Sequence, residues 1–135
     1  MKSTPLLLAL AVCLLLAAPA GAGSDALSPG TYTMKLTDKG PVLNGNWKLK
    51  FTTTFAPAGK FLITKNGALK VAGDSAVTGN KVTFVDQSGP LRCKGNQQGG
   101  VYSFTLKQKK LTLKALADLC AGRQLVLATK PFTRQ

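Results

Sequence analysis

The chain has 135 residues, with 18 Lys and Arg against 5 Asp and Glu, which gives a formal net charge of +13. It contains no histidine, and all five acidic residues are aspartates. Because the usual general bases and metal ligands are missing, these counts argue against an ordinary hydrolase. We expect a protein that is not an enzyme and that needs no cofactor or metal.

The first 22 residues have the pattern of a cleaved signal peptide. Lys2 provides a positive start, an apolar run rich in Leu and Ala follows over residues 5–18, and Ala20-Gly21-Ala22 offers a small-x-small cleavage site. Cleavage after Ala22 leaves 113 of the 135 residues, enough for one domain over 23–135. We therefore expect a secreted or periplasmic protein whose mature chain has no transmembrane span.

The clearest strand signal is the alternation of apolar and polar residues along residues 45–55. Trp47, Leu49 and Phe51 share one face of this stretch, and lysines and threonines share the other. Similar signals recur about every ten residues, separated by turn pairs such as Asn66-Gly67. We expect strands at residues 31–37, 45–55, 61–65, 68–77, 81–86, 101–108, 111–115 and 124–130.

Eight strands joined by short loops form an antiparallel meander, which can close into an up-and-down barrel without free edges. Gly73 interrupts the fourth expected strand and predicts a bulge or a sharp bend, while Leu69 and Val71 of that strand should point inward. No stretch shows a sustained helical period, apart from weak helical character over residues 114–119, and we expect residues 116–122 to form a loop before the last strand.

Two cysteines, Cys93 and Cys120, remain after the leader and its Cys13 are removed. In an exported chain, two cysteines favour one disulfide. The metal alternative is poor, because two thiols without a histidine do not complete a tetrahedral zinc site. A disulfide between positions 27 residues apart should stabilise the fold by about 3 kcal/mol.

The lysines fall mostly on the outward phase of the expected strands, and two interpretations of them stay open. Without Lys2 the net charge falls by one to +12, and such a field attracts an anionic surface or polymer: polysaccharide, lipid or nucleic acid. The alternative is that the lysines keep an exported β protein soluble and its edges unpaired. Exposed aromatic residues that could stack on bases are not evident, which weakens the nucleic-acid alternative.

Several short motifs follow one another over nearly the whole mature chain. They are Gly30-Thr31-Tyr32-Thr33, Gly45-x-Trp47, Asp86-x-Ser88-Gly89-Pro90, Cys93, Asp118-x-Cys120-Ala121-Gly122-Arg123 and Pro131-Phe132-Thr133-Arg134. Their order resembles that of small exported bacterial lipocalin-like proteins of the calycin superfamily. The resemblance implies an eight-stranded barrel with Trp47 near its floor and Arg134, from the last strand, across the tryptophan ring.

Five further aromatic residues share the inward phase of the strands. They either fill the core or leave a gap that suits a small apolar ligand, with a tyrosine as polar handle. Trp47 likewise either lines a cavity or plugs one end of the barrel. Arg134 either covers the Trp47 ring as a cation–π lid or belongs to a frayed tail. The five aromatic residues are Phe51, Phe61, Phe84, Tyr102 and Phe104.

Asp86 continues the inward phase of Val82 and Phe84 and would lie near a barrel end. A buried carboxylate needs a partner, which Arg123 or Arg134 could supply. We expect a structural ion pair, with a functional site at Asp86 as the alternative.

Together these patterns predict an all-β, eight-stranded antiparallel barrel, monomeric, that binds a small apolar molecule without catalysis. The expected ligand contacts are Trp47, the five inward aromatic residues and Arg134. Two alternatives remain: a basic module that binds anionic surfaces, and a structural exported domain without a ligand. An interior volume of roughly 300 Å³ or more around Trp47 would support a ligand, whereas a filled interior would favour the basic exterior.

Overall fold

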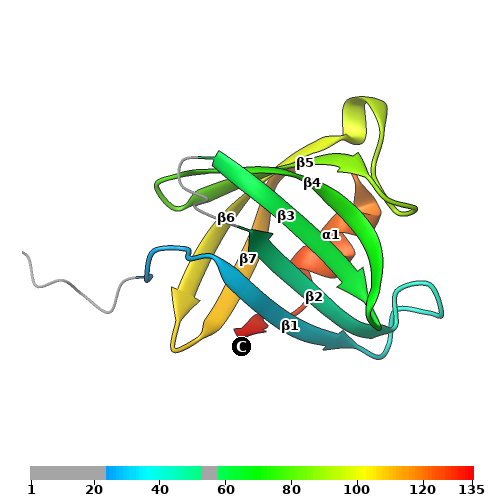
Figure 1. Ribbon diagram of the computed structural model, residues 1–135, viewed down its shortest axis with the longest axis horizontal. Coiled ribbons are helices and arrows are strands. Elements are labelled where there is room, and N and C mark those ends of the chain that lie inside the picture. The colour runs from blue at the N-terminus through cyan, green and yellow to red at the C-terminus, as the bar shows by residue number, and fades with distance from the viewer. Residues whose placement is uncertain (1–23, 53–57) are drawn as a thin grey trace, which may run out of the picture.

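The computed structural model describes residues 24–52 and 58–135, which form a closed antiparallel barrel of eight strands (Figure 1). Each strand pairs with its neighbour in the sequence, and β8 closes the barrel by pairing with both β7 and β1. The predicted fold class is therefore confirmed. The elements are β1 (Gly30–Leu36), β2 (Gly45–Thr52), β3 (Ala58–Lys65), β4 (Ala68–Thr78), β5 (Lys81–Ser88), η1 (Gly95–Gln97), β6 (Gly99–Lys107), β7 (Lys110–Asp118), α1 (Ala121–Ala128) and β8 (Phe132–Arg134).

The alternation along β2 gives the strand one buried face and one exposed face, as the sequence predicts. Trp47, Leu49 and Phe51 are at most 1% exposed, and Lys48 and Lys50 between them are exposed. Successive side chains of a strand point to opposite faces, so one face of the strand lies in the core and the other in solvent. The same pattern places apolar residues of β1 and of β3 to β7 inside the barrel.

Aromatic rings fill a large part of the interior. Phe84 lies at their centre, with its ring centroid 6.1 Å from that of Phe51, 5.1 Å from Phe61 and 5.7 Å from Tyr102. Tyr32 extends the cluster by an edge-to-face contact with Phe51 at 5.9 Å. Edge-to-face packing of this kind adds about 0.5–1.5 kcal/mol per pair to the gain from burial.

The predicted irregularity at Gly73 is present. The register between β4 and β5 shifts between Ala72 and Gly73, so that Gln87 of β5 is the extra residue. A side chain at Gly73 would overlap the carbonyl oxygen of Val85, which explains why the position is glycine.

The inward prediction for Leu69 is wrong, because Leu69 is 47% exposed. A second shift lies between β3 and β4, where Ile63 pairs with Val71 but Thr64 pairs with Leu69. Lys70 is therefore the extra residue, and the inside–outside phase of β4 changes there. Val71 remains buried, as predicted.

The predicted loop over 116–122 and strand over 124–130 are also wrong. β7 continues to Asp118, α1 covers Ala121–Ala128, and the last strand is Phe132–Arg134. The buried residues of α1 are Arg123, Val126 and Leu127, a helical spacing, whereas Leu125 is 39% exposed. Eight residues are too few for the helical period to be distinguished from a strand pattern in the sequence.

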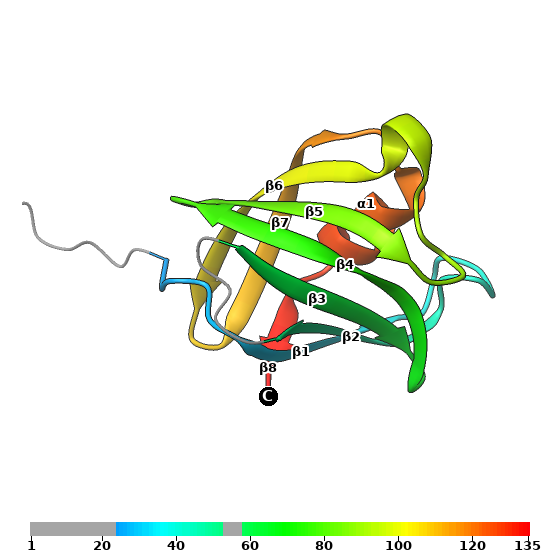
Figure 2. The same ribbon diagram turned by 45° about the horizontal axis from the view of Figure 1, so that its top comes forward.

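Helix α1 starts at the barrel end where β7 finishes and carries the chain back towards β8 (Figure 2). Within the ranges that the structure describes, no helix is long and apolar enough to cross a membrane. The predicted signal peptide over 1–22, and the part of the second predicted strand beyond Thr52, lie outside the described residues.

Candidate functional site

The site lies at the barrel end where β2, β4 and β6 begin and β1, β3, β5 and β7 finish, called here the α1 end. Trp47 enters the interior near the start of β2, and its indole Nε1 donates a hydrogen bond to the carbonyl oxygen of Leu43 at 2.7 Å. The bond satisfies the indole N–H and fixes the ring, which is 1% exposed. Trp47 is thus a rigid wall of this end of the barrel.

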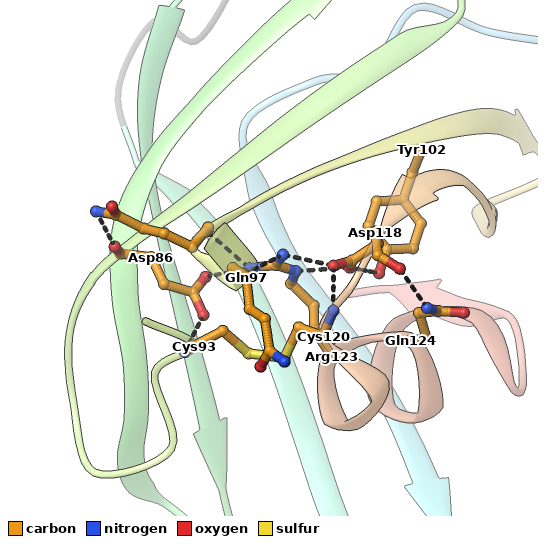
Figure 3. The surroundings of a disulfide bond; sticks show 9 residues. Asp86, Cys93, Gln97, Tyr102, Asp118, Cys120, Arg123 and Gln124 are labelled. Carbon is orange, nitrogen blue, oxygen red and sulfur yellow. Dashed lines mark hydrogen bonds and ion pairs between the residues drawn. A yellow bond between two sulfur atoms is a disulfide. The ribbon is translucent and has the colours of Figure 1, made fainter. Parts of the chain in front are cut away.

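A buried cluster of one arginine and two aspartates also lies at the α1 end (Figure 3). Nε and Nη2 of Arg123 donate to Oδ2 and Oδ1 of Asp118, at 2.7 and 2.6 Å. Nη1 of Arg123 lies 3.1 Å from Oδ1 of Asp86. The three side chains are 0–3% exposed. Of the two candidate partners of Asp86, the structure therefore selects Arg123. A second carboxylate, Asp118, binds the same guanidinium.

Backbone groups complete the hydrogen bonds of this cluster. Arg123 donates to the carbonyl oxygens of Gln97 and Gln98, both at 2.9 Å. The amide of Cys93 donates to Asp86 at 2.8 Å, and the amide of Cys120 donates to Asp118 at 2.9 Å. The cluster thereby joins β5, β7, α1 and the segment before β6, and removing one member would leave a buried charge without its partner.

The protonation states follow from burial and from these bonds. Burial alone raises the pKa of Asp118, but hydrogen bonds from Arg123, Tyr102 and the Cys120 amide outweigh it and hold the pKa below its usual value. Burial lowers the pKa of Arg123, yet its bonds to Asp118 and the charge of Asp86 raise it overall. Burial and the adjacent Asp118 carboxylate raise the pKa of Tyr102, which stays protonated and donates to that carboxylate.

The predicted disulfide between Cys93 and Cys120 is confirmed, with 6.2 Å between the Cα atoms. It connects the segment after β5 to the residue before α1, next to both carboxylates of the cluster (Figure 3). The disulfide and the ion pairs therefore hold the same two segments together. Among the described residues, no group of three or more Cys, Asp, Glu or His side chains forms a candidate metal site.

A cavity of about 160 Å³ lies between Trp47, the disulfide and the start of α1. Most of its wall is apolar, and Asp86 and Arg123 contribute the charged side chains. The volume is below the roughly 300 Å³ that we required from the sequence for a ligand of ordinary size, so that condition is not met. It is close to that of cavities that hold a benzene-sized molecule, at about 150 Å³. The apolar wall consists of Val42, Leu43, Trp47, Ile63, Val71, Leu91 and Val126.

The structure separates the residues that we predicted as ligand contacts. Of those seven, Trp47 lines this cavity. Phe51, Phe61, Phe84, Tyr102 and Phe104 are at most 4% exposed and do not line it, and the first four of them pack against each other.

Arg134 does not lie over Trp47 as a lid. It belongs to β8, pairs with Tyr32, and donates from Nη2 to the carbonyl oxygen of Pro29 at 3.3 Å, before β1 begins. This position is towards the barrel end opposite the cavity. The alternative of a frayed tail is also wrong, because Arg134 is paired within the sheet.

The main residue that the sequence prediction missed is Asp118. By simple alternation from Leu111 and Leu113, Asp118 would point outward, as Lys114 does. The register of β6 and β7 shifts between Val101 and Tyr102, so Leu116 is an extra residue and Asp118 turns inward. The position of Asp118, two residues before Cys120, was a signal of its role. The periodicity of the sequence does not reveal the register shift that turns it inward.

The comparisons with known proteins add no relative. No protein-family model matches the chain, and neither do curated proteins or solved structures. The structure thus defines the class of protein: a closed eight-stranded antiparallel barrel with a Cys93–Cys120 disulfide and a small apolar cavity.

Proposed function

We propose that this protein binds a small apolar molecule, about the size of one aromatic ring, in the cavity at the α1 end. The observation that carries the proposal is the cavity itself: about 160 Å³ of space with an apolar wall, in a barrel whose core is built of packed aromatic and aliphatic side chains. The resemblance of the sequence to lipocalin-like proteins supports the same function. No catalytic step is part of the proposal.

The expected affinity follows from the size of the cavity. Burying six or seven apolar carbons at about 0.8 kcal/mol each gives about 5 kcal/mol. This free energy corresponds to a Kd on the order of 0.1–1 mM. A ligand much larger than one ring would need the wall to move, because the disulfide, the ion pairs and the Trp47 hydrogen bond hold that wall in place.

The ligand would enter between two loops. Val42 lies in the loop between β1 and β2, Leu91 lies in the segment after β5, and both line the cavity. Val42 is 64% exposed and Leu91 is 38% exposed, so these side chains form the rim of the cavity at the surface. Movement of two surface loops is sufficient for entry, and the barrel itself stays closed.

The proposed place of action is outside the reducing cytoplasm, in a secreted or periplasmic setting. The Cys93–Cys120 disulfide supports it, because such bonds persist in oxidising compartments. The apolar run over residues 5–18 supports it as well.

Toluene is a suitable test ligand, and Trp47 is a suitable reporter because it is the single tryptophan and lines the cavity. We expect saturable changes in tryptophan fluorescence, and shifts of methyl signals from Ile63 and Val71 in NMR spectra. Val126→Phe should abolish both, because the added ring occupies the cavity. Leu125→Phe is the matched control, since Leu125 lies on the same helix but points to solvent.

Absence of saturable toluene binding to the folded native protein would overturn the proposal. So would equal binding by the Val126→Phe and Leu125→Phe variants, because the bound toluene would then lie elsewhere. The first of these two outcomes is measured on the native protein and needs no substitution.

A further inference from the structure

A second hollow lies on the outer surface of the barrel, on β1, β2 and the chain between α1 and β8. It has a volume of about 550 Å³. We call it the lysine groove, and its polar wall consists of Lys35, Lys48, Lys130, Thr33, Asn46 and Thr133. The three lysines are exposed. Nζ of Lys130 donates one hydrogen bond to the carbonyl oxygen of Lys35 at 3.5 Å, which leaves its other N–H groups for a partner in solution.

Strand pairing places these side chains in an ordered array. On neighbouring strands Thr33 pairs with Lys48, and Lys35 pairs with Asn46. Thr33 also pairs with Thr133 of β8 on its other side. Each lysine of the sheet is therefore next to a hydroxyl or amide group, and the array alternates positive charges with neutral hydrogen-bonding groups across three strands.

Within the described ranges 24–52 and 58–135, no acidic side chain lines the lysine groove. Of the five aspartates, Asp74 is paired with Lys60, and Asp86 and Asp118 are paired with Arg123 in the barrel interior. The other two, Asp25 and Asp38, do not line the groove. The positive potential of the groove is therefore not neutralised from within its own wall, and an anionic partner would supply the missing charge.

We propose that the lysine groove binds an acidic polysaccharide, a chain of sugar units that carry carboxylate or sulfate groups. Threonine and asparagine side chains both donate and accept hydrogen bonds, as sugar hydroxyls require, and the lysines pair with the acidic groups. Because the Thr33 hydroxyl already donates to the Thr133 carbonyl and accepts from Gln135, Asn46 and Thr133 are the main neutral contacts. The groove opens on the outer surface and shares Trp47 with the wall of the cavity. The proposed binding of a polysaccharide does not depend on the function proposed for the cavity.

Two other polyanions fit the wall less well. Single-stranded nucleic acid requires exposed aromatic rings for base stacking, and the one ring in the groove wall, Trp47, is 1% exposed. A membrane surface requires apolar side chains that insert between lipids. None of the large apolar side chains exposed in the described part of the chain lines the groove.

The test compares two variants with the same change in net charge. Lys35→Gln, Lys48→Gln and Lys130→Gln together remove the groove charges. The control removes three exposed lysines elsewhere: Lys81→Gln, Lys94→Gln and Lys114→Gln. The probes are heparin and polygalacturonate, with binding measured by calorimetry at several salt concentrations.

We expect the groove variant to lose about tenfold or more in affinity for both polysaccharides, and the slope of log K against log salt to fall by about 3. The control variant should stay within about threefold of the native protein. Equal losses in the two variants would overturn the proposal, because binding would then follow net charge alone. Tighter binding of poly-dT or of vesicles rich in phosphatidylglycerol than of either polysaccharide would overturn it too. Unchanged circular dichroism establishes that both variants are folded.

Discussion

Gly100 lies where the buried ion pairs pass closest to the backbone of β6. A Cβ atom at this position would be 2.6 Å from Oδ2 of Asp118 and 2.8 Å from Nη2 of Arg123. Real side chains do not approach so closely, so a methyl group there would push the guanidinium and the carboxylate apart. The charge cluster therefore requires glycine at position 100, because glycine has no side chain that would displace the two charged groups.

We predict that Gly100→Ala lowers the free energy of unfolding by about 1–3 kcal/mol, the usual cost of overpacking. The neighbouring Gly99→Ala is the matched control, because the nearest atom to its added Cβ is 3.9 Å away. Urea denaturation of the two variants measures the difference. Equal stabilities would show that the cluster tolerates the methyl group.

The buried cluster was only half predictable from the sequence. Asp86 follows the alternation of β5, and a buried carboxylate requires a cation, so an arginine partner could be predicted, with Arg123 and Arg134 as candidates. The structure selects Arg123. The inward position of Asp118 depends on the extra residue Leu116. A bulge of one residue reverses the face of every following side chain, and the sequence of β7 contains no mark of it.

At the scale of single elements, two hairpins have turns of the same backbone conformation but different residues. The turn between β3 and β4 uses Asn66 and Gly67, and the turn between β6 and β7 uses Gln108 and Lys109, all at positive φ. Asn and Gly adopt this conformation at low cost, whereas Gln and Lys do so with strain. The second hairpin is therefore the less stable of the two locally.

Replacing Gln108-Lys109 by Asn-Gly should raise the free energy of unfolding by about 1 kcal/mol. The reciprocal change, Asn66-Gly67 to Gln-Lys, should lower it by more than this, because it also removes the hydrogen bond that the Asn46 amide donates to Oδ1 of Asn66 at 2.9 Å. Thermal denaturation of both variants measures the two effects. A loss of stability from the Asn-Gly substitution would contradict the argument. Neither substitution changes the cavity, so toluene binding should be preserved in both.

Helix α1 shows why a short element is hard to predict. Arg123 and Leu127 lie on the buried face of the helix, but the same two residues also share one face of a strand. The chain adopts the helix because β7 ends at Asp118 at the α1 end, and the chain must return to β8 near the other end. Tertiary geometry, rather than local propensity, decides the outcome.

At the scale of the whole molecule, the buried cluster makes stability depend on pH. The pKa of Asp118 is lower in the folded protein than its value of about 3.9 in the unfolded chain. Its contribution is therefore fully present above pH 4 and is lost as the pH falls below that value towards the folded pKa. The unfolding midpoint in urea should be nearly constant between pH 5 and 7 and fall steeply below pH 4.

Asp118→Asn should lower the free energy of unfolding at pH 7 by about 3 kcal/mol and make the acid dependence shallower. Asp74→Asn is the control, because the pKa of Asp74 is also lowered, mainly by its hydrogen bond to Lys60, but that pair is exposed. We expect little change in stability from the control. An acid dependence that is the same in Asp118→Asn and native protein would contradict this assignment.

The sequence by itself determined the all-β class, the first seven strands, the inward residues of most strands and the disulfide. These features depend on local alternation, on turn residues and on the number of cysteines, all of which a linear chain displays. Tertiary structure alone decided the helix, the inward position of Asp118 and the cavity beside Trp47. A cavity is the volume that side chains from distant segments leave unfilled, so no single stretch of the chain encodes it.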